Sequence, residues 1–151
     1  MHQALSKHTG FLISRMGMVA ERHFATRIAT VGLTPRLWGV LNVLDHEGPI
    51  SQQSLGRSVG VDPSSMVATI DELEHKGLVE RRRHPSDRRA HALHITELGR
   101  TTLAQGRKVA KAAQEELLAP LDESERELLH ALLLRLAVAS AAAPVSPTTS
   151  G

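Results

Sequence analysis

An arginine-rich segment at residues 79–96 constrains the fold of this chain more than any other part of it. Two short alternating runs flank a turn-forming centre, Pro85-Ser86-Asp87, and this pattern predicts a β-hairpin. Its five arginines stand against two carboxylates, those of Glu80 and Asp87, so the formal charge of the hairpin is +3. A hairpin this small has little core of its own. We therefore expect its tip to contact something negative, and duplex DNA is the first candidate.

The chain before the hairpin contains signals for four helices. A long amphipathic helix is predicted at roughly 6–30, and a second opens at Thr34-Pro35 and ends at Gly48-Pro49. Ser51 caps a short helix at 52–58, and Asp62 caps the fourth, which extends to Lys76. The apolar stripe predicted for the first helix is Leu12, Met16, Val19, His23 or Phe24, and Ile28. The fourth helix carries the apolar residues Met66, Val67, Ile70 and Leu73.

Two further helices are predicted after the hairpin. Thr96 caps a long helix that reaches about Leu118, and Asp122 forms a capping box with Glu125 at the start of the last helix. Its stripe is Leu128, Leu129, Leu132, Leu133 and Leu136. The regions 6–33 and 97–142 carry more apolar surface than a small core can cover, which predicts a dimerisation region. The alternative is that these stripes cover only their own core. Residues 143–151 are predicted to form a disordered tail.

Residues 34–96 have the pattern of a winged helix-turn-helix. Two helices meet across a tight turn, Val59-Gly60-Val61-Asp62, and a hairpin follows the second helix directly. The expected fold class is mostly α with a small β-hairpin wing. The central region is expected to be the DNA-binding domain.

The fourth helix is the candidate recognition helix. Its first turn contains Pro63, Ser64 and Ser65, and the serine hydroxyls can bond phosphates or base edges. Thr69, one turn later, offers a hydroxyl and a methyl group suited to thymine. The alternative is that the serines only cap or solvate a helix start. On the preceding helix, Gln52, Gln53 and Arg57 are predicted DNA-backbone contacts, although a solvated role fits the two glutamines equally well.

Within the hairpin, the arginines have two predicted roles. Arg81, Arg82 and Arg83 lie on the incoming strand, where nonspecific attraction to phosphates is expected. Arg88 and Arg89 lie near the tip, and Arg89 is the predicted minor-groove side chain, oriented by Asp87 through a bidentate pair. The alternative is an ordinary solvated basic turn. With two Phe, one Trp and no Tyr, the chain lacks the aromatic side chains on which single strands stack, which favours duplex DNA.

Several segments together resemble the multiple-antibiotic-resistance regulator (MarR) family. They are Leu55-Gly56-Arg57, Leu73-Glu74-His75-Lys76-Gly77-Leu78-Val79-Glu80-Arg81, Asp87-Arg88-Arg89 and Leu93-His94-Ile95-Thr96-Glu97-Leu98-Gly99, and the resemblance covers about 6–140. It implies a homodimeric transcription regulator, most often a repressor. The recognition helices would lie in successive major grooves of a pseudo-palindrome and the wings in flanking minor grooves.

The resemblance also assigns roles to individual residues. Arg89 would enter the minor groove with Asp87 as its partner, and Ser64, Ser65 and Thr69 fall on base- or phosphate-contact positions. Ala68 is a departure, since some members have a basic base-reading side chain there. Family members often release DNA on binding small anionic or aromatic ligands. Candidate cleft residues here are Arg15, Met16 and Trp38, although Met16 and Trp38 also fit a plain core role.

Composition excludes several other classes. The chain has no cysteine, so disulfides and thiolate metal sites are excluded, and its net charge is only +2. No apolar run approaches the ~20 residues that span a membrane, and a cytoplasmic protein is expected. His91 and His94 point to opposite faces of a strand, so no metal or other cofactor is expected. No motif favours an enzyme. The alternative function is a winged-helix module that binds protein, although such a module needs no arginine cluster.

Overall fold

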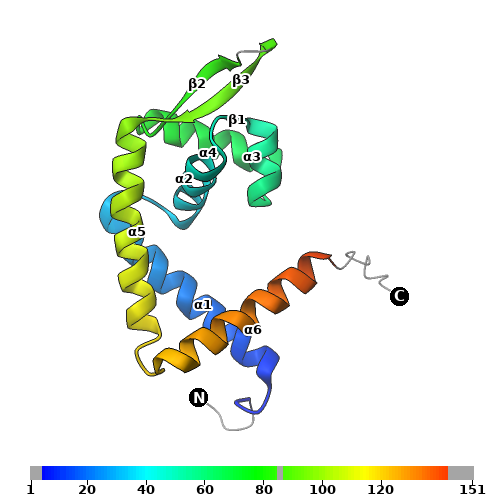
Figure 1. Ribbon diagram of the computed structural model, residues 1–151, viewed down its shortest axis with the longest axis vertical. Helices are drawn as coiled ribbons and strands as arrows, with labels where there is room; N and C mark the ends of the chain where they lie inside the picture. Colours follow the sequence, from blue (N-terminus) through cyan, green and yellow to red (C-terminus); the bar gives the residue numbers. More distant parts are fainter. Residues whose placement is uncertain (1–4, 85–86, 143–151) are drawn as a thin grey trace. The chain divides into compact units, whose positions relative to one another are not determined.

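The computed structural model describes residues 5–84 and 87–142, and their order confirms the expected class, mostly α with a small β-sheet (Figure 1). The predicted tail, 143–151, lies outside the described residues. Contacts divide the chain into two units, 1–114 and 115–151. The elements are α1 (Thr9–Ile28), a 3-10 turn (Ala29–Val31), α2 (Pro35–Glu47), β1 (Ile50–Ser51), α3 (Gln52–Val59), α4 (Pro63–His75), β2 (Val79–His84), β3 (Asp87–Ile95), α5 (Glu97–Leu117) and α6 (Glu123–Ala142).

Side-chain caps fix where α2, α3 and α4 begin, as predicted. The Thr34 hydroxyl accepts a hydrogen bond from the Leu37 amide at 3.3 Å, and the Ser51 hydroxyl accepts one from the Ser54 amide at 3.1 Å. Asp62 Oδ1 accepts from the Ser65 amide at 3.0 Å. Each cap satisfies an amide that has no partner within its helix. The turn between α3 and α4 contains Gly60 at φ 65°, a left-handed conformation that favours glycine.

Strands β2 and β3 form the predicted hairpin, and a third strand completes the sheet. The strand order is β1-β3-β2, with antiparallel pairing throughout and an irregularity between Arg83 and His84. Strand β1 was not predicted, because two residues are too short to show a sequence period. It pairs Ile50 with Leu93 and so joins the start of α3 to the base of the wing.

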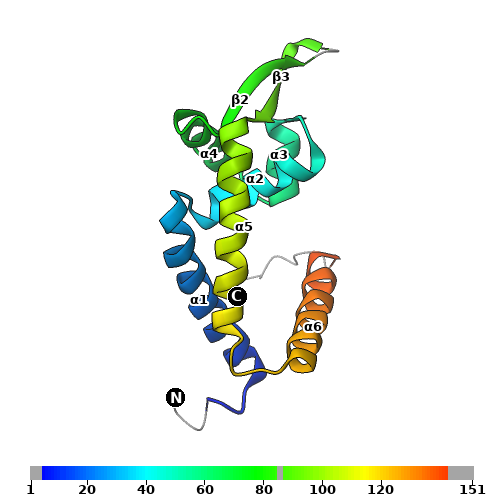
Figure 2. The same ribbon diagram turned by 60° about the vertical axis from the view of Figure 1, so that its left-hand side comes forward.

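One apolar core holds α2, α3, α4 and the base of the sheet together. Its members include Leu41 from α2, Leu55 from α3, Ile70 from α4 and Leu93 from β3, each at most 1% exposed. Burial of this kind provides most of the folding free energy of a small domain. The hairpin β2–β3 continues past these helices, as Figures 1 and 2 show. The core therefore supports the recognition helix and the base of the wing as one body.

Helix α5 begins in close contact with the base of the hairpin. The Thr96 hydroxyl accepts a hydrogen bond from the Gly99 amide at 3.0 Å and donates one to the Gly77 carbonyl at 2.7 Å. A Cβ atom on Gly99 would overlap the Leu78 carbonyl oxygen and lie 2.8 Å from Cγ1 of Ile95. Only glycine allows this approach of α5 to the segment that leads into β2.

Unit 115–151 contains the end of α5 and helix α6. The predicted capping box is confirmed: the Glu125 amide donates to Asp122 Oδ1, and the Asp122 amide donates to Glu125 Oε2, both at 2.9 Å. The hydrogen bonds from the Glu125 amide and the Ser124 hydroxyl lower the pKa of Asp122. Within the described residues, no helix is long and apolar enough to cross a membrane.

Candidate nucleic-acid interface

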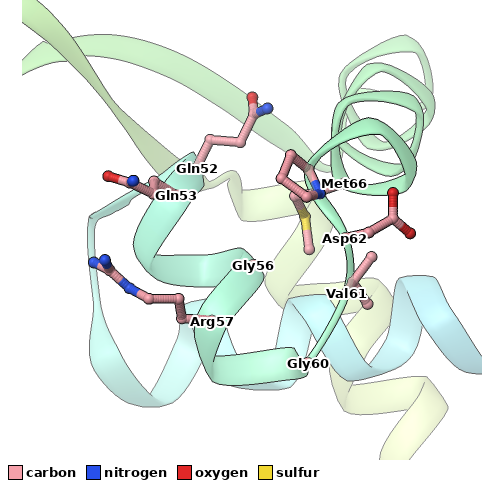
Figure 3. Close-up of a pocket in the computed structure, with 9 residues that line it drawn as sticks. Gln52, Gln53, Gly56, Arg57, Gly60, Val61, Asp62 and Met66 are labelled. Atoms are coloured by element: carbon pink, nitrogen blue, oxygen red, sulfur yellow. The ribbon is translucent and has the colours of Figure 1, made fainter. Parts of the chain in front are cut away.

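A groove between α3 and the start of α4 brings together four of the residues predicted to contact DNA. Its volume is about 750 Å³, and Figure 3 shows its lining. Gln53 and Arg57 project from neighbouring turns of α3, while the Met66 side chain extends from α4 toward the groove. The lining residues are Gln52, Gln53, Gly56, Arg57, Gly60, Val61, Asp62, Pro63 and Met66. Hydrogen-bond donors and one cation thus lie beside the N-terminus of α4, where the helix dipole favours an anion.

The two serines at the start of α4 are tied to the capping carboxylate. The Ser64 hydroxyl donates to Asp62 Oδ1 at 2.6 Å, and the Ser65 amide donates to the same oxygen at 3.0 Å. These bonds, the Ser64 hydroxyl first and the Ser65 side chain and amide next, hold the pKa of Asp62 far below its usual value near 3.8. The Ser64 hydroxyl hydrogen is therefore already used within the protein.

Thr69 does not occupy the position expected from the sequence. It is 3% exposed, and its hydroxyl donates to the Ser65 carbonyl at 2.7 Å. It belongs to the inner face of α4, with Met66, Ile70 and Leu73, whereas Val67 is exposed. The proposed base contact of Thr69 requires a side chain that this helix instead buries. The physical reason is the 3.6-residue period, which puts positions 66, 69, 70 and 73 on one face.

In the wing, the Arg81 side chain reaches carboxylates on α4, although it stays partly exposed to solvent. It pairs across the sheet with the buried Leu93, and its guanidinium forms ion pairs with Glu74 and with Asp71, the latter at 3.0 Å. A weaker hydrogen bond reaches Gln52 Oε1 at 3.5 Å. The two-residue period of a strand could have predicted this orientation of Arg81, because Arg81 lies on the same face as Val79. The expected general phosphate attraction of Arg81 is thus replaced by contacts within the protein.

The remaining wing residues fall into two groups. Arg82 forms an ion pair with Glu80, and Arg83 is exposed on β2. Asp87, Arg88 and Arg89 lie on the described backbone of β3, but their side chains are outside the described part of the structure. The pairing of Arg89 with Asp87 therefore stays a prediction.

The three predicted cleft residues do not line a single cavity among the described residues. Trp38 packs edge-on against Phe24, with ring centroids 5.1 Å apart, and its Cδ1 would lie 3.0 Å from a Cβ on Gly106 of α5. Met16 is 48% exposed on α1. Arg15 instead borders an open hollow of about 540 Å³ along α1, lined also by Met18, Val19, Arg22, His23, Thr26 and Arg27.

Sequence reasoning missed a polar cluster that joins α5 to α2. Arg107 Nη2 lies 2.8 Å from Asp45 Oδ2, and its Nε donates to Asn42 Oδ1 at 3.1 Å. Arg100 approaches the other carboxylate oxygen of Asp45 at 3.8 Å. Because these partners are more than 50 residues apart in the chain, no local sequence pattern predicts the cluster. The cluster joins α5, which follows the hairpin in the chain, to α2.

The chain resembles known transcription regulators in sequence and structure. The MarR family model matches residues 33–91. The putative transcriptional regulatory protein for the hcr operon of Thauera aromatica is 36% identical over 137 residues, which are 90% of this chain and 82% of that protein. The transcriptional repressor CouR, solved on a 23-mer DNA duplex, is 33% identical with a TM-score of 0.82, covering 89% of this chain and 96% of that one. A probable transcriptional regulator from Pseudomonas aeruginosa is 32% identical with a TM-score of 0.78, covering 87% and 98% respectively.

Proposed function

Because the chain belongs to the MarR family of transcriptional regulators, we propose that it is a repressor that binds a pseudo-palindromic DNA operator as a homodimer. One recognition helix would enter the major groove in each half-site, and each wing would reach a flanking minor groove. The observation that carries the proposal is the groove of Figure 3, where Gln52, Gln53 and Arg57 lie beside the N-terminus of α4. The similar repressor CouR is bound to a DNA duplex, which supports duplex DNA as the partner.

Exposed apolar side chains support a dimer. Helix α1 exposes Ile13, Met16, Met18 and Val19, and α6 exposes Leu128, Leu132, Leu133, Leu134, Leu136 and Val138. Apolar surface of this extent on terminal helices is typical of protein interfaces. A second copy of the chain would cover it and would set the spacing of the two recognition helices. Sedimentation equilibrium would test the dimer independently of DNA.

Selection of duplexes from a random pool, followed by fluorescence anisotropy, would test DNA binding. We expect one pseudo-palindromic motif, and an affinity that falls steeply as salt rises. Arg57→Ala should weaken binding and reduce the slope of log K against log salt by about 1. Lys108→Ala, which removes the same charge from an exposed position on α5, is the matched control and should change neither quantity. No enriched motif would contradict sequence-specific binding.

A protein-binding winged helix is the second candidate function. The basic residues of the wing and the exposed Arg57 favour DNA over such a role. If duplex binding were weak and insensitive to sequence at all salt concentrations, the interaction module would be the better explanation. The same anisotropy experiment therefore separates the two functions.

We also propose that a small anionic aromatic ligand releases the regulator from DNA. Arg15 supplies a cation at the hollow on α1, with the apolar side chains of Met18 and Val19 beside it. Titration calorimetry with a panel of aromatic carboxylates, repeated with Arg15→Gln, is the test. Heat and operator release that both disappear in the variant would support the site. If no ligand of the panel gave heat, the proposed ligand site would be contradicted. The proposal of DNA binding would still stand.

A further inference from the structure

We propose that Val67 is the base-reading side chain of α4 and that it contacts the methyl group of a thymine in each operator half-site. This inference rests on the proposed DNA-binding function and adds a specificity determinant to it. The structure leaves Val67 44% exposed, an apolar side chain in the middle of the recognition helix.

The Ser64 and Thr69 hydroxyls on α4 are already engaged as donors within the protein. The Ser64 hydroxyl donates to Asp62, and that of Thr69 donates to the Ser65 carbonyl from a buried position. For either hydroxyl to donate to a base, it would have to give up a short hydrogen bond within the helix. Such a loss would offset much of what the new bond contributes. Donation from these two hydroxyls to a base is therefore disfavoured, and the exposed Ser64 oxygen keeps its capacity to accept a hydrogen bond.

The exposed residues of α4 form one outward face. Ser64, Val67 and Asp71 are exposed at positions i, i+3 and i+7, which lie on one side of a helix. The Asp71 carboxylate is paired with Arg81 at 3.0 Å, so its charge is partly offset within the protein, because the same guanidinium also pairs with Glu74. Ala68 is exposed beside Val67 and has only a methyl group. The centre of the outward face is thus apolar.

The chemistry of the base edges indicates which base an apolar side chain can recognise. Base edges in the major groove present donors, acceptors and one apolar group, the C5 methyl of thymine. A valine offers two methyl groups and no hydrogen bond, so thymine is the base it can distinguish. An apolar contact of this type would also account for the exposure of Val67, which adds nothing to the core of the free protein. The expected operator therefore has a thymine opposite Val67 in each half-site.

Replacement of thymine by deoxyuridine isolates this contact, because deoxyuridine keeps the pairing and the O4 acceptor and lacks only the methyl group. The probe is the duplex selected by the wild-type protein, with each thymine of one half-site replaced in turn. We expect one position at which deoxyuridine weakens wild-type binding about fourfold, the factor for losing one buried methyl group. For Val67→Ala, the same replacement should have no effect at that position.

Two controls keep the result interpretable. Arg57→Ala should weaken binding to the thymine and deoxyuridine duplexes by the same factor, because its predicted partner is a phosphate. Val67→Thr, which retains one methyl group, should retain part of the discrimination if the variant binds in the same register. Equal deoxyuridine effects in wild type and Val67→Ala, or no effect at any position, would overturn the inference. Failure of the wild-type protein to select any duplex would instead overturn the proposed function.

Discussion

Arg81 on β2 places its Nη2 atom 3.0 Å from Oδ1 of Asp71, a carboxylate on the outward face of the recognition helix. The same guanidinium pairs with Glu74 one turn further along α4, and it reaches Gln52 on α3 at 3.5 Å. One side chain therefore connects the wing, the recognition helix and the preceding helix. Its single positive charge offsets one of the two negative charges that these carboxylates carry.

We predict that Arg81→Ala lowers operator affinity without the change in salt dependence that loss of a phosphate contact produces. The variant leaves Asp71 and Glu74 unpaired close to DNA and removes a link between wing and helix. Arg83 is exposed on the same strand, and Arg83→Ala should reduce the slope of log K against log salt by about 1. Anisotropy titrations at several salt concentrations would measure both variants.

Arg81→Ala combined with Asp71→Asn and Glu74→Gln is the matched test of this explanation. If uncompensated carboxylates cause the loss, the triple variant should recover much of the wild-type affinity. A slope reduced by about 1 in Arg81→Ala itself would show that Arg81 contacts a phosphate, contrary to its position in the structure.

Local sequence signals predicted the framework of the fold well. The caps Thr34, Ser51, Asp62 and Asp122 each satisfy an amide at a helix start, and each of these bonds joins residues three positions apart. The wing was predicted from alternation and turn residues. Information of this range is present in the sequence itself, so the order of the six α-helices and the hairpin, and the starts of the capped helices, followed from it.

The candidate site was predicted less well, for two physical reasons. The outward face of α4 depends on which side packs on the core, and the polar Thr69 was taken for an exposed residue although the helix buries it. The partners of Arg81 and Arg107 come from other elements, up to 65 residues away for Arg107 and Asn42. Side-chain pairing at that range follows from tertiary packing, which no local pattern contains.

Gly99→Ala should destabilise the protein strongly. Its Cβ would overlap the Leu78 carbonyl oxygen, a backbone atom that cannot move without shifting α5 from the base of the hairpin. We expect a loss of roughly 1–3 kcal/mol or more, the usual cost of overpacking. Gly39→Ala is the control, since nothing lies within 4 Å of its Cβ and alanine favours a helix interior by about 0.5–1 kcal/mol. Chemical denaturation would measure both, and equal stabilities would contradict the close approach at Gly99.

Asp62→Asn should lower stability near neutral pH and have little effect in acid. Asparagine caps a helix about as well as aspartate, so the difference reports the carboxylate charge. The Ser64 and Ser65 hydrogen bonds lower the pKa of folded Asp62 below its usual value of 3.8. The contribution of the charge is therefore full at pH values above 3.8 and is lost as the pH falls through the folded pKa. Melting temperatures of both proteins across this range should converge in acid, and a constant difference would contradict the prediction.

Arg89→Ala should lower operator affinity by roughly 1–3 kcal/mol if Arg89 is the minor-groove side chain of the wing. Its backbone lies at the start of β3, beyond the irregularity that follows Arg83, so the change should leave the core and the dimer unaffected. Asp87→Ala should cause a similar loss, because the arginine would lose its orienting partner. The double variant should then be little weaker than either single one, since both changes remove the same contact. Additive losses would show that the two residues act separately, and tighter binding by Asp87→Ala would show that the carboxylate only repels DNA.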